Sequence, residues 1–227
     1  MPIAVKNTTL PGLFDLLAPH VCLGCGRVGA PLCDCCKKYI ISAYAHVCPN
    51  CKNRLDDAVC PNCVNQPVVY AVGARAGLLD VIIRSYKYQS VRSLAKALAE
   101  LLDGVLPLDF ERVVVVPLPT ATHHVRARGF DHTLLIARKL AKLRGYSVQR
   151  MLVREKNTVQ VGADQETRVA QANQAFRFNS KICVNERTTY LLIDDVWTTG
   201  ATVRAATRLL SETGVKNLAV AILAYSV

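Results

Sequence analysis

The chain has 227 residues, of which 51% are hydrophobic, and its 28 lysine and arginine residues outnumber its 17 aspartate and glutamate residues to give a net charge of +11. That apolar share supports a folded core and excludes an intrinsically disordered protein. No apolar run reaches the ~18 residues of a membrane-spanning helix, and the first residues lack the layout of a secretory signal. We expect a cytoplasmic protein with no membrane insertion, built as one large domain or as one medium and one small domain.

The first third of the chain is dominated by cysteine. A short helix is predicted over residues 10–18, where apolar residues recur at helical spacing. Nine of the ten cysteines then fall between Cys22 and Cys63, and eight of these form four Cys-x-x-Cys pairs. Two intervening residues let both sulfurs of a pair face one ion, and in a cytosolic protein such pairs indicate zinc ligands rather than disulfides. The predicted ligands of two zinc ions are Cys22, Cys25, Cys33, Cys36, Cys48, Cys51, Cys60 and Cys63.

The short gaps between these pairs favour two sequential sites, one from the first two pairs and one from the last two. A crossed arrangement stays open, because spacing alone does not decide the pairing. The two-residue spacing favours Cys36 over Cys35 as a ligand, and Cys183, in a strand-like context, is expected to be a buried apolar residue. Four-cysteine sites leave no position for water, so both sites are expected to be structural rather than catalytic.

From residue 67 the pattern changes to apolar strands alternating with helices, which predicts an α/β fold with a parallel sheet covered on both faces. We place a zinc module over residues 1–66 and an α/β domain over 67–227, with 67–110 partly forming a helical hood. A loop is expected between residues 117 and 131. The expected strands are 69–74, 112–116, 147–153, 190–193 and 218–225, and the expected helices are 78–88, 91–105, 132–144 and 199–213.

One stretch of the second domain, LLIDDVWTTGAT, combines acidic and hydroxyl residues. A buried strand delivers Asp194 and Asp195 to its carboxyl end, where ligands of parallel sheets collect. Gly200 permits a tight turn, and the helix that follows presents free N–H groups and its positive dipole end to a phosphate. The carboxylates need donors of their own, and the hydroxyl groups of a ribose 5-phosphate supply them.

This stretch resembles the phosphoribosyl-pyrophosphate motif of type I phosphoribosyltransferases, in which an apolar strand is followed by two acidic residues and T-T-G-x-T. The resemblance implies a type I phosphoribosyltransferase-like domain in which Asp194 and Asp195 contact the ribose hydroxyls. Trp197 stands at a variable position of the motif and is expected to pack. The residues implied to hold the 5-phosphate are Thr198, Thr199, Gly200, Ala201 and Thr202.

Further segments resemble the competence protein F family, in the same order along the chain. They are the cysteine pairs, RSYKY from residue 84, VPLPTATHHVRARGFDHTLLIA from residue 116, and a run containing Thr158, Gln160, Arg168, Asn173, Ala175 and Phe176. The chain departs from the family where Asp131 and His132 replace the usual Asn-Gln after R-G-F, so no role is carried over to these positions. His132 stays open between a functional residue and a capping or surface residue.

The resemblances imply phosphoribosyl pyrophosphate as the ligand, accompanied by Mg²⁺. The loop after the strand at 112–116, with Pro119 and Thr120, is the candidate for holding the pyrophosphate. Arg126, Arg128 and Lys87 are candidates to close over it, since guanidinium and ammonium groups suit phosphate, although each fits a solvated surface charge as well. A hood from parts of 78–105 and from residues around 160–176 would select an acceptor that the sequence does not identify.

Two functions compete. The family resemblance implies a cytoplasmic factor in DNA uptake during natural transformation, with single-stranded DNA and DNA-uptake proteins as partners. Ten basic residues against two acidic ones between residues 112 and 156 suit DNA, but they suit a phosphate-rich ligand equally well. The alternative is a nucleobase-salvage phosphoribosyltransferase, and a regulator that senses the ligand is a third possibility.

Overall fold

The computed structural model describes residues 20–42, 48, 51, 53, 60–63, 66–89, 91–155 and 175–226. The helix expected over residues 10–18, and the family-like positions Thr158, Gln160, Arg168 and Asn173, lie outside the described residues. Within the part of the chain that the structure describes, no helix is long and apolar enough to cross a membrane.

A five-stranded parallel sheet in the order β1-β7-β6-β2-β3 forms the centre of the protein and confirms the predicted α/β fold class. Both faces of a parallel sheet are buried, which explains why the central strands are nearly continuous apolar runs. Every residue of β2 is buried, as are the last seven residues of β7. The strands are β1 (Val68–Ala74), β2 (Val113–Pro117), β3 (Ser147–Val148), β6 (Thr189–Trp197) and β7 (Asn217–Tyr225).

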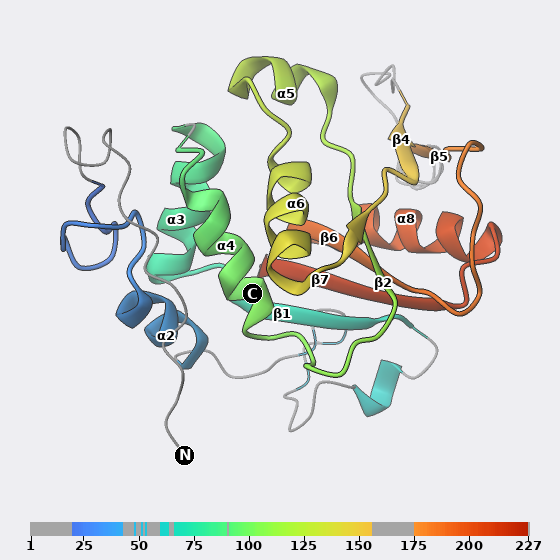
Figure 1. Ribbon diagram of the computed structural model, residues 1–227, viewed down its shortest axis with the longest axis horizontal. Helices are drawn as coiled ribbons and strands as arrows, with labels where there is room; N and C mark the ends of the chain where they lie inside the picture. The colour runs from blue at the N-terminus through green and yellow to red at the C-terminus, as the bar shows by residue number, and fades with distance from the viewer. Residues whose placement is uncertain are drawn as a thin grey trace.

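Helices cover both faces of the sheet (Figure 1). Three of them lie on one face, and α8 lies on the other. Leu98 and Ile136 belong to the buried cluster on the three-helix side, whereas Val203 and Leu210 belong to the cluster on the α8 side. The apolar stripe of each helix is therefore what holds it to the sheet. The helices are α3 (Gly77–Tyr88), α4 (Leu94–Asp103), α6 (His132–Arg144) and α8 (Ala201–Glu212).

The chain leaves the main sheet soon after β3, so the single strand expected over residues 147–153 is wrong. β3 pairs with β2 at only two positions. The chain then enters β4 (Leu152–Arg154), which pairs in antiparallel fashion with β5 (Phe176–Phe178) in a separate two-stranded sheet. Met151 and Leu152 are both buried in the cluster on the α8 side. The apolar pattern of the sequence therefore continues across the break and does not show where one strand ends and the next begins.

A short helix, α5 (Thr122–Arg128), occupies part of the segment expected to be a loop. None of its residues is buried, so it has no apolar stripe from which a helix could be predicted. It ends at Gly129, whose φ of 74° is the left-handed conformation that closes many helices. Asp131 then caps α6 by accepting a hydrogen bond from Leu134 N at 3.2 Å. The role of Asp131 that the sequence left open is thus at least that of a helix cap.

The first cysteine-rich segment packs directly onto the α/β domain. Helix α2 (Asp34–Ser42) contacts β1 and α4, and Cys22 and Ile40 belong to the same buried cluster as α3 and α4. Lys37 of α2 forms an ion pair with Glu100 of α4. Residues 20–42 therefore share a core with the sheet domain, while the boundary at residue 66 stays a prediction.

Candidate functional site

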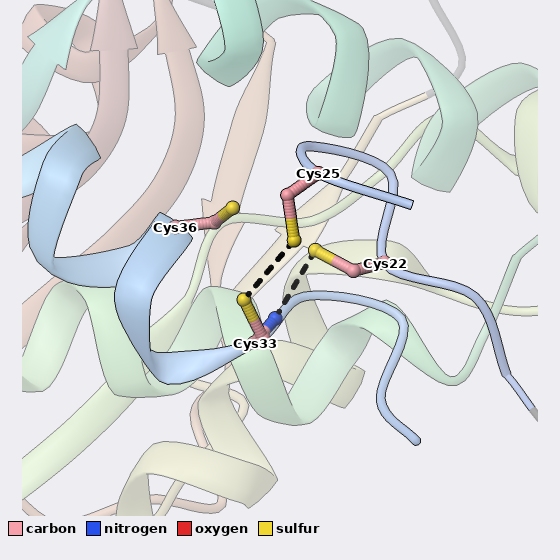
Figure 2. Close-up of side chains that lie close together, drawn as sticks. All are labelled: Cys22, Cys25, Cys33 and Cys36. Carbon is pink, nitrogen blue, oxygen red and sulfur yellow. Dashed lines mark hydrogen bonds between the residues drawn. The ribbon is translucent and has the colours of Figure 1, made fainter. Parts of the chain in front are cut away.

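Two groups of four cysteines each bring their sulfurs together, and in both groups the four Sγ atoms all lie within 4.8 Å of one another. Figure 2 shows the first group, whose side chains come from the knuckle before α2 and from α2 itself and turn toward one another. The first pair along the chain meets the second, and the third meets the fourth, which is the sequential arrangement. The groups are Cys22, Cys25, Cys33 and Cys36, and Cys48, Cys51, Cys60 and Cys63.

The separations of these sulfurs fit zinc. Tetrahedral coordination with Zn–S bonds of about 2.3 Å places neighbouring sulfurs ~3.8 Å apart. The measured Sγ–Sγ distances are 3.6 Å for Cys25–Cys33, 3.9 Å for Cys48–Cys63 and 3.5 Å for Cys51–Cys60. All these cysteines are free, and the distances are far longer than the ~2 Å of a disulfide. Each group can therefore hold one zinc ion.

Backbone donors also favour the thiolate form of Cys22 in the first group. Cys33 N lies 3.4 Å from Cys22 Sγ and donates to it. Burial raises the pKa of Cys22, but backbone donors, that of Cys33 first, outweigh burial and lower the pKa, which favours the ionised form that zinc needs. Cys35 is exposed and outside the group, as expected. The expectation that Cys183 is buried is wrong, because it lies exposed in the irregular segment after β5.

The turn between β6 and α8 presents exposed donors above an apolar floor. Gly200 has a φ of 75°, and a Cβ at this position would lie 2.5 Å from ring atoms of Trp197. Trp197 is buried, so it packs beneath the turn as the sequence predicts. The N–H groups at the start of α8 follow directly. The exposed residues of the turn are Thr198, Thr199, Ala201 and Thr202.

Arg204 braces this turn and is a residue that sequence reasoning missed. Its guanidinium donates to Thr199 O at 2.6 Å, and its Cζ lies 5.9 Å from the centre of the Trp197 ring. The side chain is exposed. A positive charge thus stands beside the turn, four residues after Gly200, where the helical repeat returns to the same face. This four-residue spacing from Gly200 is the signal by which Arg204 could have been identified in the sequence.

Asp194 and Asp195 lie within β6 rather than after it, because the strand continues to Trp197 alongside β7. Neighbouring side chains of a strand point to opposite faces, so the two carboxylates have different surroundings. Asp194 is half-buried, and its Oδ1 accepts a hydrogen bond from Asp195 N at 2.8 Å. Burial, together with the adjacent charge of Asp195, raises the pKa of Asp194.

Asp195 is only 5% exposed, and its carboxylate contacts an ammonium group and an imidazole ring. Its Oδ2 lies 2.7 Å from Lys87 Nζ, at the end of α3, and in contact with His132 Nε2, at the start of α6. Burial alone would raise the pKa of Asp195, but the bond from His132 and the charge of Lys87 outweigh it and hold the pKa well below its usual range. Asp195 is therefore an ionised carboxylate inside the protein.

His132 is the centre of this arrangement and is 6% exposed, so it is not a surface residue. Its Nδ1 lies 3.0 Å from Arg128 NH1. An arginine nitrogen only donates, so Nδ1 accepts and the ring proton resides on Nε2, facing Asp195. Tyr86 OH donates to the backbone oxygen of His132 at 2.9 Å, which fixes the start of α6 against α3. The sequence indicated His132 only as a departure from the family pattern.

Most of the sequence-predicted ligand residues converge at the carboxyl ends of β2 and β6. Thr120 Oγ1 lies 3.1 Å from His132 Nδ1, next to Arg128, and Pro119 precedes Thr120 in the chain. Lys87 reaches the same place from α3. Arg126 is exposed on α5 and is not part of this network. The site thus joins residues from four separate segments of the chain.

No family model and no curated protein matches the sequence. Among solved structures, one similar chain is an allosteric regulatory enzyme of purine biosynthesis, with 20% identity and a TM-score of 0.43 over 62% of this chain and 30% of that one. Another is a hypoxanthine phosphoribosyltransferase from Staphylococcus aureus, with 16% identity and a TM-score of 0.33 over 59% of this chain and 62% of that one. The matches span less than two thirds of either solved protein. Likeness at these values does not assign a function, which rests instead on the residues of this chain.

Proposed function

We propose that the chain binds phosphoribosyl pyrophosphate at the carboxyl end of β6, together with Mg²⁺, and acts as a phosphoribosyltransferase. One observation carries the proposal: the exposed donors around Gly200 stand at the end of the same strand that holds Asp194 and Asp195. Donors suit a phosphate, and carboxylates suit hydroxyl groups, so this pairing complements a ribose 5-phosphate.

The two carboxylates have different roles in this proposal. Asp194 is half-buried and accepts hydrogen bonds from the ribose hydroxyls, while the 5-phosphate lies against residues 198–202. Asp195 is buried, and its Oδ2 already forms an ion pair with Lys87 and contacts His132. We therefore assign that oxygen to holding the site in shape rather than to contacting the ligand.

The pyrophosphate belongs, in this proposal, near the loop after β2. Pro119 and Thr120 supply the loop, and Arg128 and Lys87 supply positive charge from either side of His132 and Asp195. Arg126, exposed on α5, has the weakest support among the candidates. Carboxylate oxygens such as those of Asp194 would help to hold Mg²⁺, which when bound would offset the charge of the pyrophosphate.

The transfer itself would break the bond between C1 of the ribose and an oxygen of pyrophosphate. The electron pair of that bond leaves with pyrophosphate, and a nucleophilic atom of the acceptor forms the new bond to C1. Lys87 and Arg128 would stabilise the charge that develops on the leaving group. The buried network around His132 would keep both cations in position without reorganisation during the reaction.

Trp197 offers a direct test, because it is the only tryptophan of the chain and lies against Gly200. Titration with phosphoribosyl pyrophosphate and Mg²⁺ should change its fluorescence saturably, with calorimetry run in parallel. The double variant Asp194→Asn with Asp195→Asn should lose binding. A matched control is Asp109→Asn, which removes an exposed carboxylate far along the chain from β6. No saturable signal in either measurement on the folded wild type would reject the proposal.

The resemblance to the competence protein F family supports a cytoplasmic role in DNA uptake, with single-stranded DNA and DNA-uptake proteins as partners. Arg138, Lys139 and Lys142 are exposed on α6 and are compatible with a polyanion. Single-stranded DNA should then bind with an affinity that falls steeply with salt. Pyrophosphate release with one member of a panel of bases, and no DNA binding, would instead identify a nucleobase-salvage enzyme.

A further inference from the structure

A cavity of about 600 Å³ lies between the loop after β2, helix α5 and the β4–β5 hairpin. Its volume falls within the range of ~300–1,000 Å³ typical of small-molecule sites. Leu134 and Leu152 line it together with further apolar residues, and two arginines, Arg150 and Arg154, line it as well. The ligand that such a cavity would accept therefore has an apolar body and a negative charge.

The two arginines are placed differently. Arg154 is anchored, since its NH1 donates to Pro119 O at 3.4 Å and its Cζ lies 5.5 Å from the centre of the Phe176 ring. Arg150 is held through its backbone, whose oxygen accepts from Asn179 Nδ2 at 3.3 Å. No acceptor among the described residues contacts the Arg150 guanidinium, which is exposed. Arg150 thus has hydrogen-bond donors to offer to a ligand.

One carboxylate, that of Asp131, also lines the cavity. Its Oδ1 accepts from Thr120 Oγ1 at 2.9 Å and from Leu134 N at 3.2 Å. These two donors reduce its repulsion of an anion. With two guanidinium groups against one carboxylate, the lining keeps a net positive charge.

The cavity shares the loop after β2 with the proposed site, since both Pro119 and Thr120 line it. Thr120 lines the cavity, and its Oγ1 lies 3.1 Å from His132 Nδ1, while His132 Nε2 contacts Asp195. In the sheet, β2 and its loop stand between β6 and the segment after β3 that lines the cavity. A ligand in the cavity would therefore be separate from a ligand at β6.

We propose that this cavity binds a small organic acid, with Arg150 and Arg154 holding its carboxylate and Leu134 and Leu152 contacting its apolar body. The binding of this acid does not depend on the proposed function. Pyrophosphate fits this cavity less well, because five of its lining residues are apolar and Lys87 and Arg128 lie elsewhere.

The test uses the full zinc-loaded chain and three pairs of probes: benzoate, nicotinate and anthranilate, each with its uncharged amide. Binding is followed by ligand-observed NMR or calorimetry. At least one carboxylate should bind in preference to its amide, and Arg150→Gln or Arg154→Gln should weaken it about tenfold or more, as expected for a lost charge-assisted bond. Arg177→Gln is the matched control, since Arg177 lies on the same hairpin but pairs with Glu155 at 2.8 Å and does not line the cavity.

Phosphoribosyl pyrophosphate is titrated separately, through Trp197 fluorescence, with the same variants. Unchanged affinity in Arg150→Gln supports an independent acid site. An equal loss of phosphoribosyl pyrophosphate and acid binding would assign both arginines to the pyrophosphate and overturn the proposal, as would the absence of any preference for carboxylate over amide. If the wild type binds an acid but not phosphoribosyl pyrophosphate, the proposed function fails while the cavity assignment stands.

Discussion

Replacing Gly200 by alanine tests whether the turn between β6 and α8 depends on close packing against Trp197. Two penalties arise in this variant. A φ of 75° disfavours any residue with a Cβ, at a cost of about 1–2 kcal/mol. The new Cβ would also stand 2.5 Å from the buried indole ring, and relieving such overpacking costs about 1–3 kcal/mol. The free energy of unfolding should therefore fall by about 2–5 kcal/mol.

Gly145→Ala separates the two penalties. Gly145 closes α6 with a φ of 71°, nearly the same conformation, but a Cβ there meets nothing within 4 Å. This variant should therefore lose only about 1–2 kcal/mol. In a domain of this size each kcal/mol corresponds to ~2–4 °C in melting temperature, so thermal denaturation followed by circular dichroism resolves the difference.

Equal destabilisation of Gly200→Ala and Gly145→Ala would refute the packing argument, because it would mean that the indole moves aside at no cost. The fluorescence of Trp197 adds a second readout. Its emission should change in Gly200→Ala and remain that of the wild type in Gly145→Ala. The same comparison bears on function, since only Gly200→Ala alters the turn proposed to hold the 5-phosphate.

Three further predictions concern the carboxylates and the zinc ligands. Lys87→Met leaves Asp195 buried with one partner fewer and should lower the free energy of unfolding by about 3–5 kcal/mol, as urea denaturation will show; adding Asp195→Asn should recover part of this loss. The raised pKa of Asp194 means that its contribution to stability is full below the ordinary carboxyl range and is lost as pH rises through the folded-state pKa, so Asp194→Asn should gain stability relative to wild type as pH increases. A constant difference across pH would contradict this. Cys36→Ser should release zinc to a colorimetric chelator and lower the melting temperature, whereas Cys35→Ser, one residue away, should do neither.

The features that sequence predicted well are those whose chemistry is contained in a few adjacent residues. Cys-x-x-Cys pairs specify a knuckle by themselves, and the sequence of acidic residues, threonines and Gly200 specifies a strand end and a turn. The parallel sheet followed from buried apolar runs. In each case the physical cause of the structure lies within about ten residues of its effect, so no knowledge of the fold is needed.

The features that sequence missed depend on contacts between distant segments. His132 and Asp195 are 63 positions apart, and only the packing of α6 against the sheet brings them together. Helix α5 escaped prediction because none of its residues is buried. The break between β3 and β4 escaped it because Met151 stays buried through the break. Apolar periodicity reports burial, so it cannot distinguish two buried arrangements of the same residues.

The divided surroundings of Asp194 and Asp195 explain why a ligand site would use two adjacent carboxylates rather than one. Lys87 and His132 keep Asp195 ionised, and that fixed negative charge is one reason that the pKa of its neighbour Asp194 is raised. The raised pKa means that Asp194 keeps its proton to higher pH than an isolated surface carboxyl does. Binding of a magnesium-bearing ligand to Asp194 must then displace a proton, which makes binding stronger as pH rises. Asp195 would not take part in this exchange, because its charge is already balanced inside the protein by Lys87. Asp195 thus keeps a fixed negative charge, whereas Asp194 would lose its proton when the ligand binds.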